Sequence, residues 1–199
     1  MTSGLFVLST AVTAAGLLDG IDHGAAAAFR RTAGHVGDVV MSWLALPASV
    51  PLCAGWLAIL AVVAVSHRPW WRGRVLTLAV LVVTGVTVEL VLKALIDHPG
   101  PYPTRGVIAL GSGDVGRGSF PSGHAFRGTT MAFGTALLAR PARRRPALVL
   151  ASAYSVLLAW ALLFLSWHWT SDVIGGVLLG LTAASTVAAV AAHDRRASA

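Results

Sequence analysis

Charged residues are scarce in this chain of 199 residues: Asp, Glu, Lys and Arg make up 12% of it, whereas hydrophobic residues make up 56%. A typical soluble domain is about 25% charged, so a surface of this composition could not be kept in water. The scarcity argues against a soluble enzyme, a disordered chain and a nucleic-acid-binding domain, although the formal net charge is +7. The single cysteine, Cys53, excludes an internal disulfide and a cysteine-rich metal site. A mean hydropathy of +0.74 instead indicates an integral membrane protein.

The chain contains several long apolar runs. A helix needs about 20 mostly apolar residues to cross the hydrocarbon core of a bilayer. Five runs fit this length, the third being short: residues 43–66, 75–96, 124–139, 147–167 and 173–192. A sixth, residues 5–18, is marginal, and it lacks the basic start of a signal peptide, which favours a retained first helix. The sequence predicts one all-α domain over residues 1–199 with about six transmembrane helices, and an interfacial amphipathic helix within residues 19–40.

Arginines are distributed unevenly over the loops between these runs. Nine lie on one side of the predicted bundle: Arg68, Arg72, Arg74, Arg140, Arg143, Arg144, Arg145, Arg195 and Arg196. By the positive-inside rule this side, with the C-terminus, is cytoplasmic, and the opposite loops face outward from the plasma membrane. Four tryptophans at predicted helix ends are expected as interfacial anchors: Trp70, Trp71, Trp167 and Trp169.

Three polar clusters fall at the outward ends of the last four predicted spans. The first contains Lys93, the only lysine of the chain, near the end of an apolar run. A lysine at the bilayer centre costs about 2.5–3.5 kcal/mol, and such residues are candidates for function. Glu89 lies four residues earlier, so a simple intrahelical ion pair is the structural alternative.

The second cluster is Pro121-Ser122-Gly123-His124, at the start of an apolar helix. Unpaired N–H groups and the positive end of the helix dipole favour an anion there, and a glycine lets the backbone approach it closely. Arg127 falls on the same helical face as His124. An ordinary helix cap by Ser122 would explain the same residues.

The third cluster pairs His168 with Asp172, four residues apart at the start of the last helix. A carboxylate at this spacing orients the imidazole and raises its basicity, as in hydrolase triads. Alone, the pair is a weak signal that a surface contact would also explain. Together, a lone cation, an anion-binding helix start and an oriented histidine suit phosphoryl transfer from a lipid phosphate.

The motifs resemble those of the type 2 phosphatidic acid phosphatase superfamily of membrane lipid phosphatases. Its Pro-Ser-Gly-His motif is intact at 121–124, its His-x-x-x-Asp motif is present at 168 and 172, and its first motif keeps Lys93 and Pro101. The signature region covers about residues 93–172, and order and predicted topology agree over roughly 40–190. Two family arginines are missing, since Gly100 and Leu162 occupy their positions. Losing two charge-assisted hydrogen bonds costs about 3–6 kcal/mol of anion stabilisation.

The resemblance implies hydrolysis of a lipid phosphate or diphosphate, polyprenyl or phospholipid, without metal or other cofactor. It implies that His168 attacks phosphorus to form a phosphohistidine, that Asp172 orients it and that His124 protonates the leaving oxygen. Further implied phosphate ligands are Lys93, Ser122, Gly123 and Arg127. His98, Arg105 and Arg117 are the other candidates to substitute for the missing arginines.

A catalytically impaired pseudoenzyme is the main alternative, because Gly100 and Leu162 replace arginines. It would act as a lipid-binding or scaffold protein. A vanadate-dependent peroxidase ranks lower, since it would need at least as many cations around the oxyanion. A transporter ranks lowest, because intramembrane charges are few and no halves repeat. Gly176 and Gly180 have a spacing that suits either a homodimer or internal packing.

Overall fold

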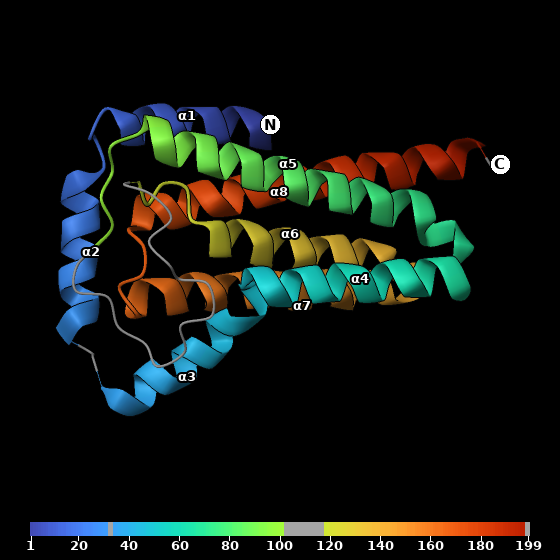
Figure 1. Ribbon diagram of the computed structural model, residues 1–199, viewed down its shortest axis with the longest axis horizontal. Helices are drawn as coiled ribbons and strands as arrows, with labels where there is room; N and C mark the ends of the chain where they lie inside the picture. The colour runs from blue at the N-terminus through green and yellow to red at the C-terminus, as the bar shows by residue number, and fades with distance from the viewer. Residues whose placement is uncertain (32–33, 102–117, 198–199) are drawn as a thin grey trace.

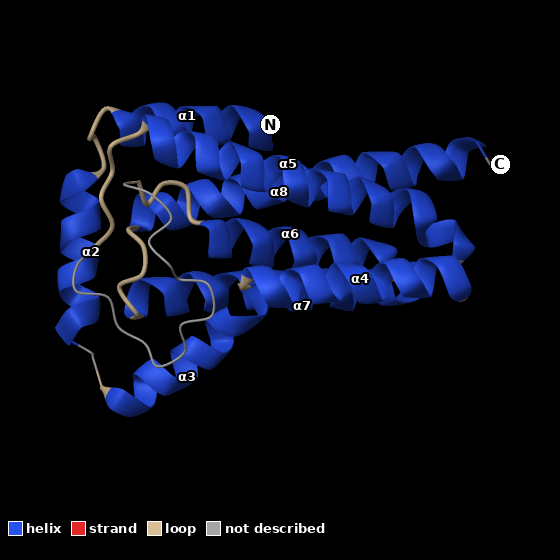
Figure 2. Ribbon diagram, viewed as in Figure 1, coloured by secondary structure: helices blue, strands red, loops and turns tan. Residues whose placement is uncertain are grey.

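The computed structural model describes residues 1–31, 34–101 and 118–197, and every regular element in these residues is helical (Figures 1 and 2). The prediction of an all-α fold is confirmed for this part of the chain. The α-helices, in chain order, are α1 (Thr2–Ala14), α2 (Asp19–Arg31), α3 (His35–Ala45), α4 (Val50–Ser66), α5 (Arg72–Leu95), α6 (Gly123–Leu138), α7 (Pro141–Phe164) and α8 (Thr170–Ala197). There are also two 3₁₀ turns in the described residues: η1 (Leu46–Ala48) leads into α4, and η2 (Pro69–Trp71) leads into α5.

Helix α6 lies at the centre of the bundle and packs against α5, α7 and α8 (Figure 1). Most of its residues are buried, and close approach by its neighbours depends on glycines. A Cβ at Gly85 of α5 would overlap the ring of Phe126, and one at Gly180 of α8 would lie 2.8 Å from the Cβ of Thr129. Gly176 and Gly180 therefore serve internal packing in this structure.

Gly176→Ala is expected to destabilise the fold by about 1–3 kcal/mol, because a tightly packed core does not accept an added methyl group. The new Cβ would overlap the carbonyl oxygen of Ser122 and lie 2.8 Å from the Cβ of Ala125. Gly73→Ala is the matched control, since nothing lies within 4 Å of a Cβ there, and alanine favours a helix. Thermal unfolding in detergent measures both. A Gly176→Ala midpoint equal to or above that of the unchanged protein would contradict the packing argument.

Three helices of the described residues are long and apolar enough to cross a membrane: α5, α7 and the Thr170–Ala192 part of α8. Two bent pairs raise the number to as many as five, namely α1 with α2, bent by 88°, and α3–η1 with α4, bent by 45°. Helix α6, with 16 residues, is shorter than a full span. The expected membrane protein is therefore confirmed, whereas the count of about six spans stays a prediction.

The predicted span at 43–66 is interrupted in the structure. Helix α3 ends at Ala45, η1 follows, and α4 begins only at Val50, after Ser49 adopts an extended conformation. Pro47 and Pro51 lie on either side of this break. Proline has no N–H to donate to the carbonyl four residues back and is tolerated in the first turn of a helix but not in its interior, so α4 begins with Pro51 in its first turn and the apolar run folds as two helices.

The segment expected as one interfacial helix at 19–40 divides between α2 and the start of α3. Helix α2 runs across the end of the bundle (Figure 1) and packs against α7 and α8. Asp19 and His23 lie on α2, and the His23 ring packs edge-on against Trp169, with centroids 4.9 Å apart. Helix α2 therefore covers the end at which α6 and α8 begin.

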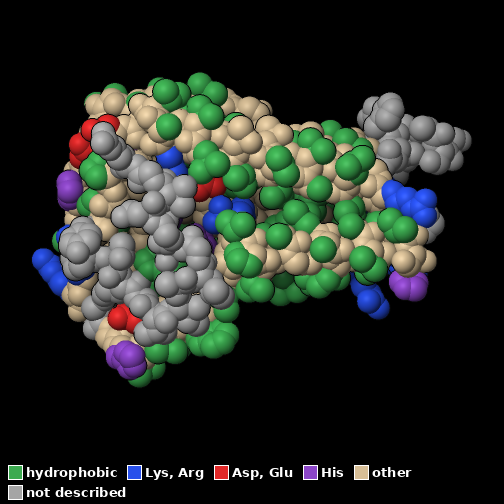
Figure 3. Space-filling model, in the orientation of Figure 1, with side chains coloured by type: hydrophobic (Ala, Val, Ile, Leu, Met, Phe, Trp, Pro, Cys, Tyr) green, Lys and Arg blue, Asp and Glu red, His purple; other side chains and the backbone are tan. Residues whose placement is uncertain are grey.

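The two ends of the bundle differ in their side chains. The connections from α4 to α5 and from α6 to α7 lie at the end away from α2, as does the C-terminus (Figure 1). These connections and the starts of α5 and α7 hold most of the arginines expected to be cytoplasmic. Along the bundle, Figure 3 shows many exposed hydrophobic side chains. Val62, Val83, Leu150 and Trp160 are among those exposed by half or more. An apolar belt between two polar ends is what a bilayer requires.

Candidate active site

The start of α6 is built from the Pro-Ser-Gly-His motif. Ser122 caps the helix, its Oγ accepting from the Ala125 N–H at 3.3 Å, and its own N–H donates to the Asp172 carbonyl at 2.9 Å. A Cβ at Gly123 would overlap the carboxylate of Glu89, so only glycine fits there. The helix cap by Ser122 is therefore present, and an anion site at the same helix start stays a prediction. The motif joins the starts of α6 and α8 to the end of α5.

His168 and Asp172 lie at the start of α8, as their spacing predicted. Asp172 is fully buried, and its Oδ2 accepts from the Trp169 N–H at 2.9 Å and lies 3.4 Å from His168 Nδ1. A carboxylate in the first turn of a helix is favoured by the helix dipole. With Nδ1–H directed at the carboxylate, Nε2 of His168 keeps its lone pair and can act as a nucleophile.

His124 is buried at the start of α6, and its ring packs against Trp167 with centroids 5.4 Å apart. Its imidazole lies within electrostatic range of Arg127, His168 and Lys93. The structure thus brings the two motif histidines and the lone lysine into one region. Trp167 therefore contacts a residue of the candidate site, and its predicted place as an interfacial anchor stays a prediction.

Lys93 and Arg127 share one buried carboxylate. Glu89 is 5% exposed, its Oε1 accepts from Lys93 Nζ at 2.9 Å, and its Oε2 accepts from Arg127 Nη1 at 3.1 Å. Arg127 Nε also donates to the carbonyl of Ala48 at 3.1 Å. The intrahelical ion pair is therefore present, and it is extended by Arg127 into a network of two cations and one anion. This network lies directly against Gly123 of the helix start.

The positions of the two missing family arginines differ in their surroundings. Leu162 is fully buried in an apolar cluster with Ala125, Leu158 and Val173. Gly100 is exposed, and a Cβ there would meet only the Ser119 Cβ, at 3.5 Å. Position 162 is part of the core, whereas position 100 is exposed. Two of the substitute cations, Arg105 and Arg117, lie outside the described residues.

Two residues beside Asp172 come from distant parts of the chain. His98 Nε2 lies 3.4 Å from Asp172 Oδ1, and Asp22 of α2 accepts hydrogen bonds from Ser171. His98 was expected to bind phosphate, but its ring nitrogen faces carboxylates here. No signal in the sequence pointed to Asp22, because its place depends on the 88° turn between α1 and α2.

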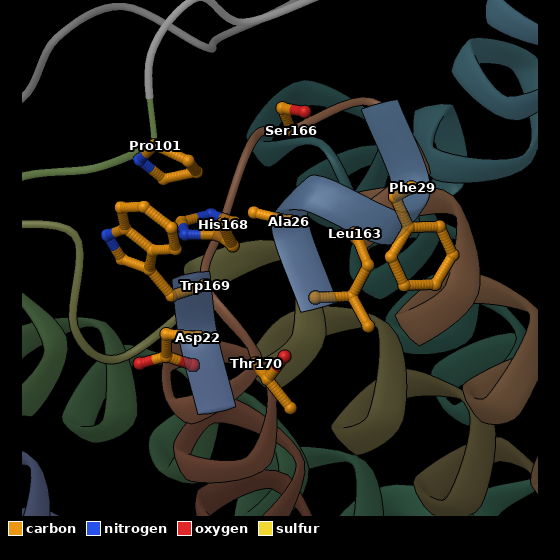
Figure 4. Close-up of a pocket in the computed structure, with 9 residues that line it drawn as sticks. All are labelled: Asp22, Ala26, Phe29, Pro101, Leu163, Ser166, His168, Trp169 and Thr170. Atoms are coloured by element: carbon orange, nitrogen blue, oxygen red, sulfur yellow. The ribbon is translucent and has the colours of Figure 1, made fainter. Parts of the chain in front are cut away.

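A small pocket lies against His168, between α2 and the residues that lead into α8 (Figure 4). Its lining residues are Asp22, Ala26, Phe29, Pro101, Leu163, Ser166, His168, Trp169 and Thr170. Phe29 and Leu163 form an apolar wall on the side away from Trp169 (Figure 4). Trp169 is fixed by its indole N–H, which donates to the Pro99 carbonyl at 2.7 Å, so it is a wall of the site as well as a residue at a helix end.

In the part of the chain that the structure describes, no three or more His, Cys, Asp or Glu side chains form a group that could hold a metal ion.

Fold and site together define a class: a helical membrane protein with two histidines, a lysine and a Pro-Ser-Gly-His turn at one end of its bundle. The family model described as the PAP2 superfamily matches residues 74–196, and the chain belongs to that superfamily. The structure is similar to the crystal structure of a transmembrane PAP2-type phosphatidylglycerolphosphate phosphatase from Bacillus subtilis. The TM-score is 0.81 at 19% identity, over 95% of this chain and 93% of that one. No curated protein matches this chain.

Proposed function

We propose that this protein hydrolyses a lipid phosphate or diphosphate through a phosphohistidine on His168. Family membership and the phosphatase fold support phosphatase activity. The observation that carries the finer proposal is the contact of His168 Nδ1 with the buried Asp172 carboxylate, beside His124 and Lys93. A nucleophile, an orienting carboxylate, an acid and a cation are the groups that this reaction requires.

In the first step, the lone pair of His168 Nε2 forms a bond to phosphorus while the bond from phosphorus to the lipid oxygen breaks. The departing oxygen takes a proton from protonated His124. Lys93 and the N–H group of Gly123 stabilise the charge on the phosphoryl oxygens, whereas the Ser122 N–H is held by the Asp172 carbonyl. In the second step, water gives its proton to His124 and attacks phosphorus, the nitrogen–phosphorus bond breaks and phosphate leaves. The route balances without a metal or other cofactor.

The site is proposed to face outward from the plasma membrane, since the arginine-rich connections lie at the opposite end of the bundle. Helices α1–α3 pack on the bundle, and α2 contributes Asp22 to the site, which supports one domain over residues 1–199. The belt of exposed apolar side chains around the bundle and the apolar wall beside His168 suit a substrate with a hydrocarbon tail.

The test is release of inorganic phosphate by the detergent-purified protein in the presence of a chelator. Polyprenyl phosphate, polyprenyl diphosphate, phosphatidate and phosphatidylglycerophosphate form the panel. Release from at least one lipid, with acid-labile phosphate on the protein during turnover, is the expected result. Release that depends on added metal would overturn the proposed route.

The pseudoenzyme is the second candidate, and the burial of Leu162 in an apolar cluster favours it. That burial excludes a phosphate ligand at a position where the family has an arginine. No release from any lipid by protein with a cooperative unfolding transition would favour this candidate over the enzyme.

His124→Ala is expected to lower turnover of an alkyl lipid phosphate by about 10²–10⁴-fold, the usual contribution of a general acid. The loss should be much smaller for an aryl phosphate, because an aryloxide leaves without protonation. Because His124 also takes the proton from water in the second step, release of the alcohol in the first turnover is compared for the two substrates. Equal losses in that first step would show that His124 is not the acid.

A further inference from the structure

Asp22 is a buried carboxylate of α2 with partners at the start of α8. It is 2% exposed; its Oδ1 accepts from the Ser171 N–H at 2.9 Å, and its Oδ2 accepts from the Ser171 hydroxyl at 2.6 Å. Burying a charged group is costly unless it is hydrogen-bonded, so these two bonds account for its stability there. They also fix α2 to the residue that directly precedes Asp172.

His98 lies between Asp22 and Asp172. Its Nε2 is 3.3 Å from Ser171 Oγ, 3.4 Å from Asp172 Oδ1 and 4.0 Å from Asp22 Oδ2. Because the Ser171 hydroxyl donates its hydrogen to Asp22, its oxygen can only accept from His98. Every neighbour of His98 Nε2 is thus an acceptor, which assigns the proton of this imidazole to Nε2.

The backbone carbonyl of His98 accepts two hydrogen bonds. It accepts from the Ser119 N–H at 2.7 Å and from the Ser119 hydroxyl at 2.9 Å. Ser119 belongs to the short segment that leads into the Pro-Ser-Gly-His turn. His98 therefore connects Ser119, which precedes α6, with Ser171 and Asp172 at the start of α8.

The two oxygens of Asp172 have different surroundings. Oδ2 faces His168 Nδ1 and the Trp169 N–H, whereas Oδ1 is buried and, among the described residues, has no hydrogen bond of good geometry. The side chain that reaches Oδ1 is His98, by an ion contact. Without it, one oxygen of a fully buried carboxylate would lack a donor, which costs about 1–3 kcal/mol or more.

We infer that Asp22, Ser171 and His98 form a polar chain that holds the Asp172 carboxylate in the orientation that His168 needs. The chain is hydrogen-bonded from Asp22 through Ser171 to His98, and it ends in the 3.4 Å contact of His98 Nε2 with Asp172 Oδ1. Asp22 and His98 are positioning residues, which act on the reaction through Asp172. The inference rests on the proposed function of His168. It also extends the site beyond the family match, because Asp22 on α2 precedes residue 74, where that match begins.

Two substitutions of His98 test the chain. His98→Leu removes the donor and is expected to lower kcat about 10–100-fold, with KM changed less than about twofold, because a misplaced Asp172 affects the reacting geometry and not lipid binding. His98→Gln keeps an N–H group near the position of Nε2 and should recover most of kcat. A raised KM with kcat unchanged would overturn the inference and make His98 a phosphate ligand. Equal activity of the Leu and Gln variants would also overturn it.

Asp22→Ala tests the far end of the chain, and it should lower kcat in the same direction as His98→Leu with KM again unchanged. Asp19→Ala is the matched control, because Asp19 is an exposed carboxylate on the same helix. Thermal unfolding of each variant shows that the fold is retained. An Asp22→Ala variant that unfolds at the usual temperature with full kcat would contradict the inference.

A readout that needs no phosphatase activity separates this inference from the proposed function. Diethyl pyrocarbonate modifies neutral imidazoles, and mass spectrometry measures its rate at His168. That rate should fall in His98→Leu and recover in His98→Gln, whether or not any lipid is hydrolysed. If the unchanged protein releases no phosphate but the rates follow this order, the proposed function fails and the chain stands. A His168 rate that is the same or faster in His98→Leu overturns the chain.

Discussion

His168→Ala is expected to lower phosphate release from the preferred lipid by about 10³-fold or more, because loss of the nucleophile removes the covalent route. No other described imidazole touches the Asp172 Oδ2 that orients it. The acid-labile phosphate on the protein should disappear with the activity. Steady-state phosphate release and quenched labelling with a radioactive lipid phosphate measure the two losses.

The matched control is His67→Ala, which removes an exposed imidazole at the end of the bundle away from the site. Its activity should equal that of the unchanged protein. Asp172→Asn should retain the fold but lose about 10²–10⁴-fold in kcat, since the amide favours the wrong tautomer of His168. Retention of activity and labelling in His168→Ala would place the nucleophile elsewhere.

Arg127→Met is expected to destabilise the protein by about 1–3 kcal/mol, because the buried Glu89 Oε2 loses its donor while Lys93 still pairs with Oε1. Methionine is similar in length and apolar, so packing changes little. Thermal unfolding in detergent, with lipid phosphatase assays on the folded fraction, measures stability and activity separately.

The double variant Glu89→Gln with Arg127→Met decides what Arg127 does. Glutamine has no carboxylate oxygen left without a donor, and its amide oxygen can still accept from Lys93, so stability should recover by part of what Arg127→Met lost. If Arg127 also binds the phosphoryl group, activity stays low in this stable protein. If Arg127 only holds Glu89, activity recovers with stability. A single variant as stable as the unchanged protein would contradict the buried network.

The sequence predicted the helices best where the apolar runs are long and unbroken. The runs at 75–96, 147–167 and 173–192 fold as α5, α7 and α8, within a few residues of the expected ends. The prediction of one span at 43–66 was wrong, because hydrophobicity alone does not indicate the break at η1 and Ser49. The two prolines there were a local signal, and they outweigh an apolar composition because they act on backbone geometry.

The candidate site was predictable where its residues lie close in the chain. Lys93 contacts Glu89 four residues away on the same helix, so helical spacing was enough. His168 also contacts Asp172 over four residues, but it lies in the bend before α8 and meets Asp172 across the helix start. Arg127 was expected beside His124 as a phosphate ligand, but it bonds to Glu89 and to the carbonyl of Ala48. These partners lie 38 and 79 residues away, and no periodicity reports on them.

The amino-acid sequence by itself determined that the chain partitions into a membrane and which reactive groups it brings there. Both follow from composition and from spacings within single helices. The tertiary structure alone decided that Leu162 is core, that Glu89 joins two cations and that Asp22 of α2 reaches Ser171. The reason is physical: local spacing sets the face on which a side chain lies, whereas the packing of helices distant in the chain sets which faces meet.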